Sequence, residues 1–242
     1  MLATGTEHSL ALSTSAPRSN GTHGTQIRSR APGIESYIAS GTLRGIEAKE
    51  HVFTEGDAKT FVYIVVTGAV CLYKILPDGR RQVIDFALPG DLIGLGAGQT
   101  EGLNAQATVA TRVRCVPVAS LRQAASHDPQ LAMRLIEALT AELDGLREHL
   151  TCIGQRSATE RLVTFLLTLS HRNAAKGADP ETIELRMTRA DIGDFLGLTI
   201  ETVSRTFSKL KALGLIEIDQ GTTIRLADID ELEAMAGGQT SH

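Results

Sequence analysis

The stretch 187–213 constrains the fold more than any other part of the chain, because it predicts two short helices joined by a tight turn. Thr188 is a good N-cap with Asp191 three residues later, and Gly197 can take the left-handed conformation that ends the first helix. Thr199 then caps the second helix. Apolar residues at helical spacing predict one buried face on each helix: Ile192, Phe195 and Leu196 on the first, and Ile200, Val203, Phe207 and Leu210 on the second.

The opposite face of the second helix is polar and charged. Arg205 can make paired hydrogen bonds to guanine and Glu201 can accept from the N4 amino group of cytosine, so this face suits the major groove of DNA. An ordinary helical hairpin with solvated charges is the alternative, because helix-turn-helix spacing often occurs by chance. The next residues favour DNA binding: 215–218 and 223–226 alternate between apolar and polar side chains around a turn at 219–221. A β-hairpin directly after such a helix is typical of a winged helix-turn-helix.

The charge distribution indicates a local rather than a general affinity for nucleic acid. The formal net charge of -4 argues against non-specific coating of nucleic acid, whereas the second helix carries Arg205, Lys209 and Lys211 against Glu201. Lys209 and Lys211 near its C-terminal end, and Arg189 at the start of the first helix, are expected to contact phosphate. The predicted DNA-contacting residues are Thr199, Glu201, Ser204, Arg205, Ser208, Lys209, Lys211 and Arg189.

Residues 51–118 consist of short runs rich in β-branched and aromatic residues, separated by turns such as 77–79. Many short strands at regular spacing predict a sandwich or a barrel-like roll. Before them, residues 1–33 hold few large apolar side chains and are expected to be disordered, while 34–45 predict a short amphipathic helix. No enzyme is expected, because His51 stands alone and no serine or cysteine has a nearby base.

Residues 129–153 predict one long helix, with Pro129 at its first position and Ser126 or Asp128 as its cap. Its apolar residues repeat with a period of 3.5, which indicates pairing with a second helix, although a helix lying on a domain surface looks similar over fewer turns. Gly154 is expected to break this helix, and the capping box at 157–160 to start another. The predicted dimer seam is Ala132, Ile136, Leu139, Leu143, Leu146, Leu150 and Ile153.

Composition limits the class of protein. With 242 residues, 42% of them hydrophobic, the chain can fill two modest cores. No apolar run approaches the roughly 20 residues of a membrane span and no signal segment opens the chain, so no membrane contact and a cytoplasmic location are expected. Cys71, Cys115 and Cys152 lie too far apart in sequence to suggest a disulfide framework or a ligand cluster. Cys152 lies off the seam and is the thiol expected to be open to oxidants.

Three strings are informative together: Y-K-I-L-P-D-G-R-R at 73–81, F-A-L-P-G-D-L-I-G at 86–94, and 188–205, which ends in F-L-G-L-T-I-E-T-V-S-R. With a roll, a long helix and a winged helix-turn-helix in this order, the chain resembles transcription regulators of the Crp/Fnr superfamily, and within it the FixK-like branch. The resemblance implies a homodimer that reads a palindrome and contacts RNA polymerase. The pattern Glu201, Ser204, Arg205 is similar to that of readers of TTGA-type half-sites, and the branch implies activation of low-oxygen or nitrogen-metabolism genes.

The expected fold class is therefore α+β, with an N-terminal β-roll of the cyclic-nucleotide-binding type, a long dimerisation helix and a C-terminal winged helix-turn-helix. The expected domains are a disordered tail at 1–33, the roll at 34–128, the dimerisation helix at 129–153 and the DNA-binding domain at 154–236.

Two features of the relatives are missing. Relatives with an oxygen-sensitive iron–sulfur cluster carry cysteines near the N-terminus, whereas the first cysteine here is Cys71, so no cluster is expected. Relatives that bind cyclic AMP have an arginine followed by serine or threonine where this chain has Ala105 and Gln106, so a cyclic nucleotide is not expected as a cofactor. The alternative is a regulator gated by a small-molecule effector that binds in the roll. Backbone amides around Gly94, Gly96 and Gly98 could cradle an anion.

Overall fold

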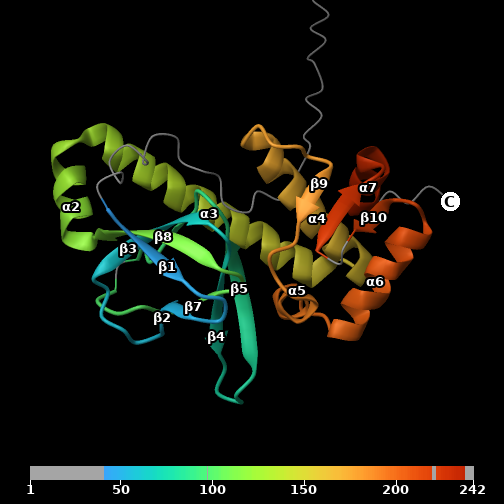
Figure 1. The fold of residues 1–242 in the computed structure, drawn as a ribbon, viewed down its shortest axis with the longest axis horizontal. Helices are drawn as coiled ribbons and strands as arrows, with labels where there is room; N and C mark the ends of the chain where they lie inside the picture. The colour runs from blue at the N-terminus through green and yellow to red at the C-terminus, as the bar shows by residue number, and fades with distance from the viewer. Residues whose placement is uncertain (1–40, 97, 220–221, 238–242) are drawn as a thin grey trace, which may run out of the picture.

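The long helix α3 (Pro129–Gln155) connects two halves of the chain (Figure 1). The computed structural model describes residues 41–96, 98–219 and 222–237. Within them a β-roll precedes α3, and a part made of helices and a three-stranded sheet follows it. The predicted α+β architecture of a roll, a long helix and a winged helix-turn-helix is confirmed.

The roll consists of two four-stranded antiparallel sheets. Residues from both sheets are buried between them, Val65 and Val113 from one and Val70 and Ala105 from the other. The first sheet contains, in spatial order, β1 (Thr42–Ile46), β8 (Thr111–Pro117), β3 (Phe61–Thr67) and β6 (Leu92–Ile93). The second contains β2 (His51–Phe53), β7 (Asn104–Ala107), β4 (Val70–Ile75) and β5 (Arg81–Ala87).

The two ends of the roll differ from expectation. Residues 42–45, the last part of the helix predicted at 34–45, instead belong to strand β1, because pairing with β8 satisfies their backbone hydrogen bonds. Residues 34–40 of that predicted helix and the predicted tail at 1–33 lie outside the described residues. After β8 the chain forms a helix that the sequence pattern did not indicate, α2 (Val118–His127). Its residue Leu121 is buried in one cluster with Val116 of the roll and Leu131 of α3.

Asp128, one of the two predicted caps, is the N-cap of α3. Its carboxylate accepts hydrogen bonds from the backbone N–H groups of Gln130 and Leu131 at 2.8 and 3.2 Å. The predicted break at Gly154 is wrong, because the helix continues through this residue to Gln155; a glycine in the last turn weakens a helix without ending it. One face of α3 packs within the chain at every seventh position, where Leu131, Ala138, Gly145 and Cys152 are buried or half-buried.

The C-terminal part begins with α4 (Ala158–Ala175), which starts at the predicted capping box, where the side chains of Ser157 and Glu160 each accept from the other's backbone N–H. Strand β11 (Thr223–Leu226) pairs with both β10 (Ile216–Asp219) and β9 (Thr182–Glu184), so the predicted wing has a third strand supplied by residues that precede the helix-turn-helix. The elements after α4 are β9 (Thr182–Glu184), α5 (Arg189–Leu196), α6 (Ile200–Ala212), β10 (Ile216–Asp219), β11 (Thr223–Leu226) and α7 (Ile229–Ala236).

The roll and the C-terminal part share one hydrophobic cluster. Phe86 of β5 lies with its ring centroid 5.4 Å from that of Phe195 on α5, in an edge-to-face arrangement, and 6.2 Å from that of Phe165 on α4. His149 of α3 stacks on the Phe195 ring, with the two ring centroids 4.0 Å apart. Three helices and a strand of the roll therefore meet around one aromatic side chain of the helix-turn-helix.

Candidate DNA-binding interface

Helices α5 and α6 form the predicted helix-turn-helix, and their caps are those expected from the sequence. The Thr188 hydroxyl accepts from the Asp191 backbone N–H at 3.1 Å, while the Asp191 carboxylate accepts from the Thr188 backbone N–H at 3.0 Å. Gly197 ends α5 with a φ of 65°. The Thr199 hydroxyl accepts from the Thr202 backbone N–H at 3.2 Å and so caps α6. Each of these contacts spans three residues or fewer, which explains why the sequence predicts them.

Gly193 is a structural requirement that the sequence pattern did not indicate. A Cβ atom at this position would lie 2.7 Å from the carbonyl oxygen of Leu198, closer than real Cβ contacts allow. The absence of a side chain at Gly193 lets α5 approach the turn that leads into α6. The available signal was a glycine inside the helical pattern, four residues before the glycine that ends the helix.

The buried face of α6 contains Val203, Phe207 and Leu210, as predicted. The prediction that Ile200 is buried with them is wrong, since its side chain is 47% exposed. Ile200 is the first residue of α6, and Cα–Cβ bonds tilt toward the N-terminus of a helix, so a first-turn side chain extends past the packed region.

The opposite face of α6 is open to solvent over its whole length. Glu201, Ser204, Arg205, Ser208, Lys209 and Lys211 are all exposed, as is Thr199 just before the helix. Within the described part of the chain, no ion pair engages Arg205, Lys209 or Lys211. The Glu201 backbone N–H, the Thr199 hydroxyl and the positive charge of Arg205 together lower the pKa of the Glu201 carboxyl. Helix α6 thus presents to solvent the Glu201 carboxylate, a hydrogen-bond acceptor, and the cations of Arg205, Lys209 and Lys211.

Arg189 lies apart from these exposed cations. Its guanidinium carbon is 3.3 Å from the centroid of the Phe207 ring, and one guanidinium nitrogen, Nη1, is buried without a hydrogen-bond partner among the described residues. Burial lowers the pKa of this guanidinium. Arg189 therefore packs between α5 and α6, and its predicted phosphate contact stays a prediction.

The predicted dimer seam lies on the outer face of α3. Four of its residues are strongly exposed for large apolar side chains: Ile136 at 54%, Leu139 at 44%, Leu143 at 46% and Leu150 at 70%. Ala132, Leu146 and Ile153 of the seam are half-buried. Met133, which the heptad pattern did not include, is 54% exposed beside them. An apolar stripe of this length on one helix is typical of a surface that a partner covers.

The prediction that Cys152 is open to oxidants is wrong. Cys152 is only 4% exposed, because it lies on the inner face of α3, where burial raises the pKa of its thiol. Cys71 is buried too, with a pKa raised by burial to about 12, and Cys115 is half-buried. No three His, Cys, Asp or Glu side chains of the described residues are grouped as they would be around a metal ion.

At Ala105 and Gln106, where the resemblance places the phosphate-binding pair of the relatives, neither side chain is a cation. Ala105 is fully buried, and the Gln106 side-chain amide donates to the Lys49 carbonyl oxygen at 2.8 Å. The Lys59 ammonium lies beside Gly96, and it already pairs with the buried Glu101 carboxylate at 3.6 Å. A second anion there would meet a carboxylate rather than a free cation.

A roll, an exposed apolar helix and a winged helix-turn-helix with a polar outer face together define a DNA-binding transcription regulator. Residues 160–235 match the family model of the Crp-like helix-turn-helix domain, and residues 43–128 that of the cyclic nucleotide-binding domain. The chain is 43% identical over 187 residues to the nitrogen fixation regulation protein FixK of Bradyrhizobium diazoefficiens, covering 77% of this chain and 78% of the relative. The chain belongs to the Crp/Fnr superfamily of transcription regulators, in its FixK-like branch.

Two further relatives agree with this family. The transcriptional activatory protein AadR of Rhodopseudomonas palustris is 38% identical over 188 residues, which are 78% of each chain. The solved structure of FixK2 from Bradyrhizobium japonicum superposes with a TM-score of 0.75 at 38% identity and covers 84% of this chain and 98% of that one. None of the helices among the described residues is both long enough and apolar enough to cross a membrane.

Proposed function

We propose that this chain is a homodimeric activator that reads a palindrome of two TTGA-type half-sites upstream of low-oxygen or nitrogen-metabolism genes. The observation that carries the proposal is the exposed face of α6, where Glu201, Ser204 and Arg205 follow the E-x-x-S-R pattern of readers of such half-sites. The relatives support the biological part, since one is named a nitrogen fixation regulation protein and another a transcriptional activatory protein.

The residues of α6 divide into base-reading and phosphate-binding groups in this proposal. Arg205 lies in the middle of the exposed face, where its guanidinium can bond guanine O6 and N7 together. Glu201, one turn earlier, accepts from a cytosine amino group and orients Arg205. Thr199, Ser204 and Ser208 are adaptable polar contacts at the edge of the same face. Lys209 and Lys211 bind phosphate near the C-terminal end of the helix.

The rest of the chain supports this reading in the proposal. Two copies pair along the seam of α3. The proposed domains are accordingly a roll at 34–128, a dimerisation helix at 129–153 and a DNA-binding domain at 154–236. The roll acts as a scaffold that holds neither an iron–sulfur cluster nor a cyclic nucleotide, and the protein works in the cytoplasm with RNA polymerase as its partner. It has no catalytic role.

Binding-site selection on two variants tests the proposal. Arg205→Ala should cost about 1–3 kcal/mol per half-site and relax the preference at one G·C pair. Lys211→Ala should weaken binding to every sequence alike and lower the salt dependence by roughly one per half-site. Both variants should be compared with wild-type protein without any added ligand, in air and under anaerobic conditions.

Two outcomes would refute parts of this proposal. If Arg205→Ala keeps the wild-type base preference and loses only salt dependence, Arg205 is a phosphate contact and the recognition assignment is wrong. If the wild-type protein binds DNA only after a small molecule is added, the roll is an effector domain and the protein is a gated regulator.

A further inference from the structure

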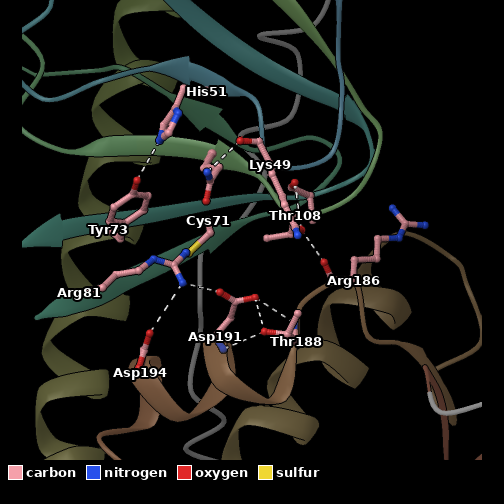
Figure 2. A network of polar contacts seen from close by, with 12 residues as sticks. Lys49, His51, Cys71, Tyr73, Arg81, Thr108, Arg186, Thr188, Asp191 and Asp194 are labelled. Atoms are coloured by element: carbon pink, nitrogen blue, oxygen red, sulfur yellow. Dashed lines mark hydrogen bonds and ion pairs between the residues drawn. The ribbon is translucent and has the colours of Figure 1, made fainter.

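Arg81 of strand β5 makes polar contacts to both the roll and the helix-turn-helix (Figure 2). Its Nη1 is 2.5 Å from a carboxylate oxygen of Asp191 and 3.7 Å from one of Asp194, both on α5. Its Nη2 donates to the Cys71 sulfur at 3.1 Å, and its guanidinium carbon lies 4.5 Å from the centroid of the Tyr73 ring. Strand β4 therefore holds the guanidinium from one side while α5 binds it from the other.

Asp191 has two tasks at once. One carboxylate oxygen accepts from the backbone N–H and the hydroxyl of Thr188, at 3.0 and 2.7 Å, and closes the capping box that starts α5. The other accepts from Arg81. Although burial by itself raises the pKa of Asp191, the hydrogen bonds from Arg81 and Thr188 bring it below its usual value. The group that starts the first helix of the helix-turn-helix is thus also the group that binds the roll.

Strand β5 contacts α5 at two more places. The Gln82 side-chain amide donates to the Asp194 carbonyl oxygen at 2.8 Å. Phe86 packs edge-to-face against Phe195. An ion pair, a hydrogen bond to the backbone and an aromatic contact along one strand restrict both the sliding and the rotation of α5.

The position of α5 also determines the position of α6, because Gly193 lets the turn after α5 pack closely against it. In a dimer on a palindrome the two recognition helices must enter major grooves about one helical turn, roughly 34 Å, apart. In such a dimer the two α3 helices pair and hold the two rolls at a fixed distance. Any movement of α5 relative to its roll therefore changes the distance between the two α6 helices.

We propose that Arg81 is a positioning residue for DNA binding: by holding Asp191 and Asp194 it fixes the helix-turn-helix on the roll and so sets the spacing of half-sites that the dimer accepts. Arg81 does not touch DNA in this proposal. The proposal rests on the dimeric, palindrome-reading function stated above.

The chain offers a matched control one residue away. Arg80 is exposed and, among the described residues, forms an ion pair only with Asp78 of its own hairpin, at 2.7 Å, so Arg80→Ala removes the same charge without affecting a contact to α5. The affinities of wild type, Arg81→Ala, Arg81→Lys and Arg80→Ala are measured on palindromes with the selected spacer and with spacers one base pair longer and shorter. Gln82→Ala serves as a second variant without a charge change, and circular dichroism confirms that each variant is folded.

Arg81→Ala should bind the selected palindrome on the order of tenfold more weakly, as expected for loss of a partly buried ion pair, and should discriminate less between spacers. Its base preference within each half-site should stay that of wild type. Arg81→Lys should recover part of the spacer discrimination, Gln82→Ala should lose a smaller part, and Arg80→Ala should behave as wild type. A loss of stability alone would weaken binding to all spacers by the same factor.

Amide hydrogen exchange on the DNA-free protein separates this proposal from the proposed function. Arg81→Ala should speed exchange in α5 relative to Arg80→Ala. Unchanged exchange in α5, an unchanged spacer preference of Arg81→Ala, or an equal effect of Arg80→Ala would each overturn the positioning role. Failure of the wild-type protein to bind any palindrome would instead refute the proposed function, and the exchange result would still decide whether Arg81 couples the two parts.

Discussion

Replacing Leu143 by Asp should separate the dimer. Leu143 is 46% exposed at the middle of the seam, so roughly half of its burial energy remains to be gained from a partner. Full burial of a leucine side chain contributes about 1.5–3 kcal/mol, which leaves about 1 kcal/mol per copy, or about 2 kcal/mol per dimer. Leu143→Ala should therefore weaken dimerisation on the order of tenfold to a hundredfold. Leu143→Asp adds two carboxylates that lose water without a partner, each costing several kcal/mol.

Sedimentation equilibrium at micromolar concentration measures this effect directly. Wild type should sediment as a dimer, Leu143→Ala as a mixture, and Leu143→Asp as a monomer. Thr151→Asp is the control, because Thr151 is an exposed residue of the same helix outside the seam. The seam assignment would be wrong if Leu143→Asp dimerised as tightly as wild type, or if Thr151→Asp dissociated the dimer equally.

Three further predictions follow from the packing of the helix-turn-helix. Gly193→Ala should lower the free energy of unfolding by about 1–3 kcal/mol, measured by chemical denaturation, because the added methyl group collides with backbone; wild-type stability would contradict the close approach. Burial lowers the pKa of His149 in the folded protein, whereas in the unfolded chain its pKa is about 6.5. As the pH falls below about 6.5, the unfolded chain therefore binds the proton before the folded protein does. The free energy of unfolding should decrease from that pH down to the lower pKa of the folded protein. His149→Phe, which keeps a ring against Phe195, should remove that part of the pH dependence, and an unchanged profile would refute it. Arg189→Ala should lower stability by about 1 kcal/mol through loss of its contact with Phe207. It should also lower the salt dependence of DNA binding by about one per half-site, as expected for a phosphate contact, and an unchanged salt dependence would refute that contact.

The predicted strands and helices succeeded where their signals were local. The sequence predicts short strands within residues 51–118, and they are observed there, among them β3 and β5, because β-branched side chains and turn residues favour these conformations within a few positions. The predictions failed where contact with residues far away in the sequence determined the local structure. Residues 42–46 became a strand through pairing with residues 111–115, which no local pattern reveals.

The candidate site shows the same division. The exposed face of α6 follows from helical periodicity, so Glu201, Arg205 and Lys209 could be assigned from the sequence as outward-facing residues. Arg189 also looked like an outward cation by position, but its long side chain reaches across to Phe207 on the next helix. Periodicity gives the direction of a Cα–Cβ bond and says little about where a long, flexible side chain ends.

The sequence by itself determined the caps, the periods and the order of the parts. The capping boxes at Thr188 and Ser157, the left-handed Gly197 and the heptad of α3 all depend on residues within one or two turns of each other, and local interactions of this kind can be read from spacing alone. Only the tertiary structure decided that Cys152 lies on the buried face of α3. It also decided how the roll packs against the helix-turn-helix. Arg81 and Asp191 are 110 positions apart in the chain, and their contact depends on the packing of two separately formed parts, which no local pattern encodes.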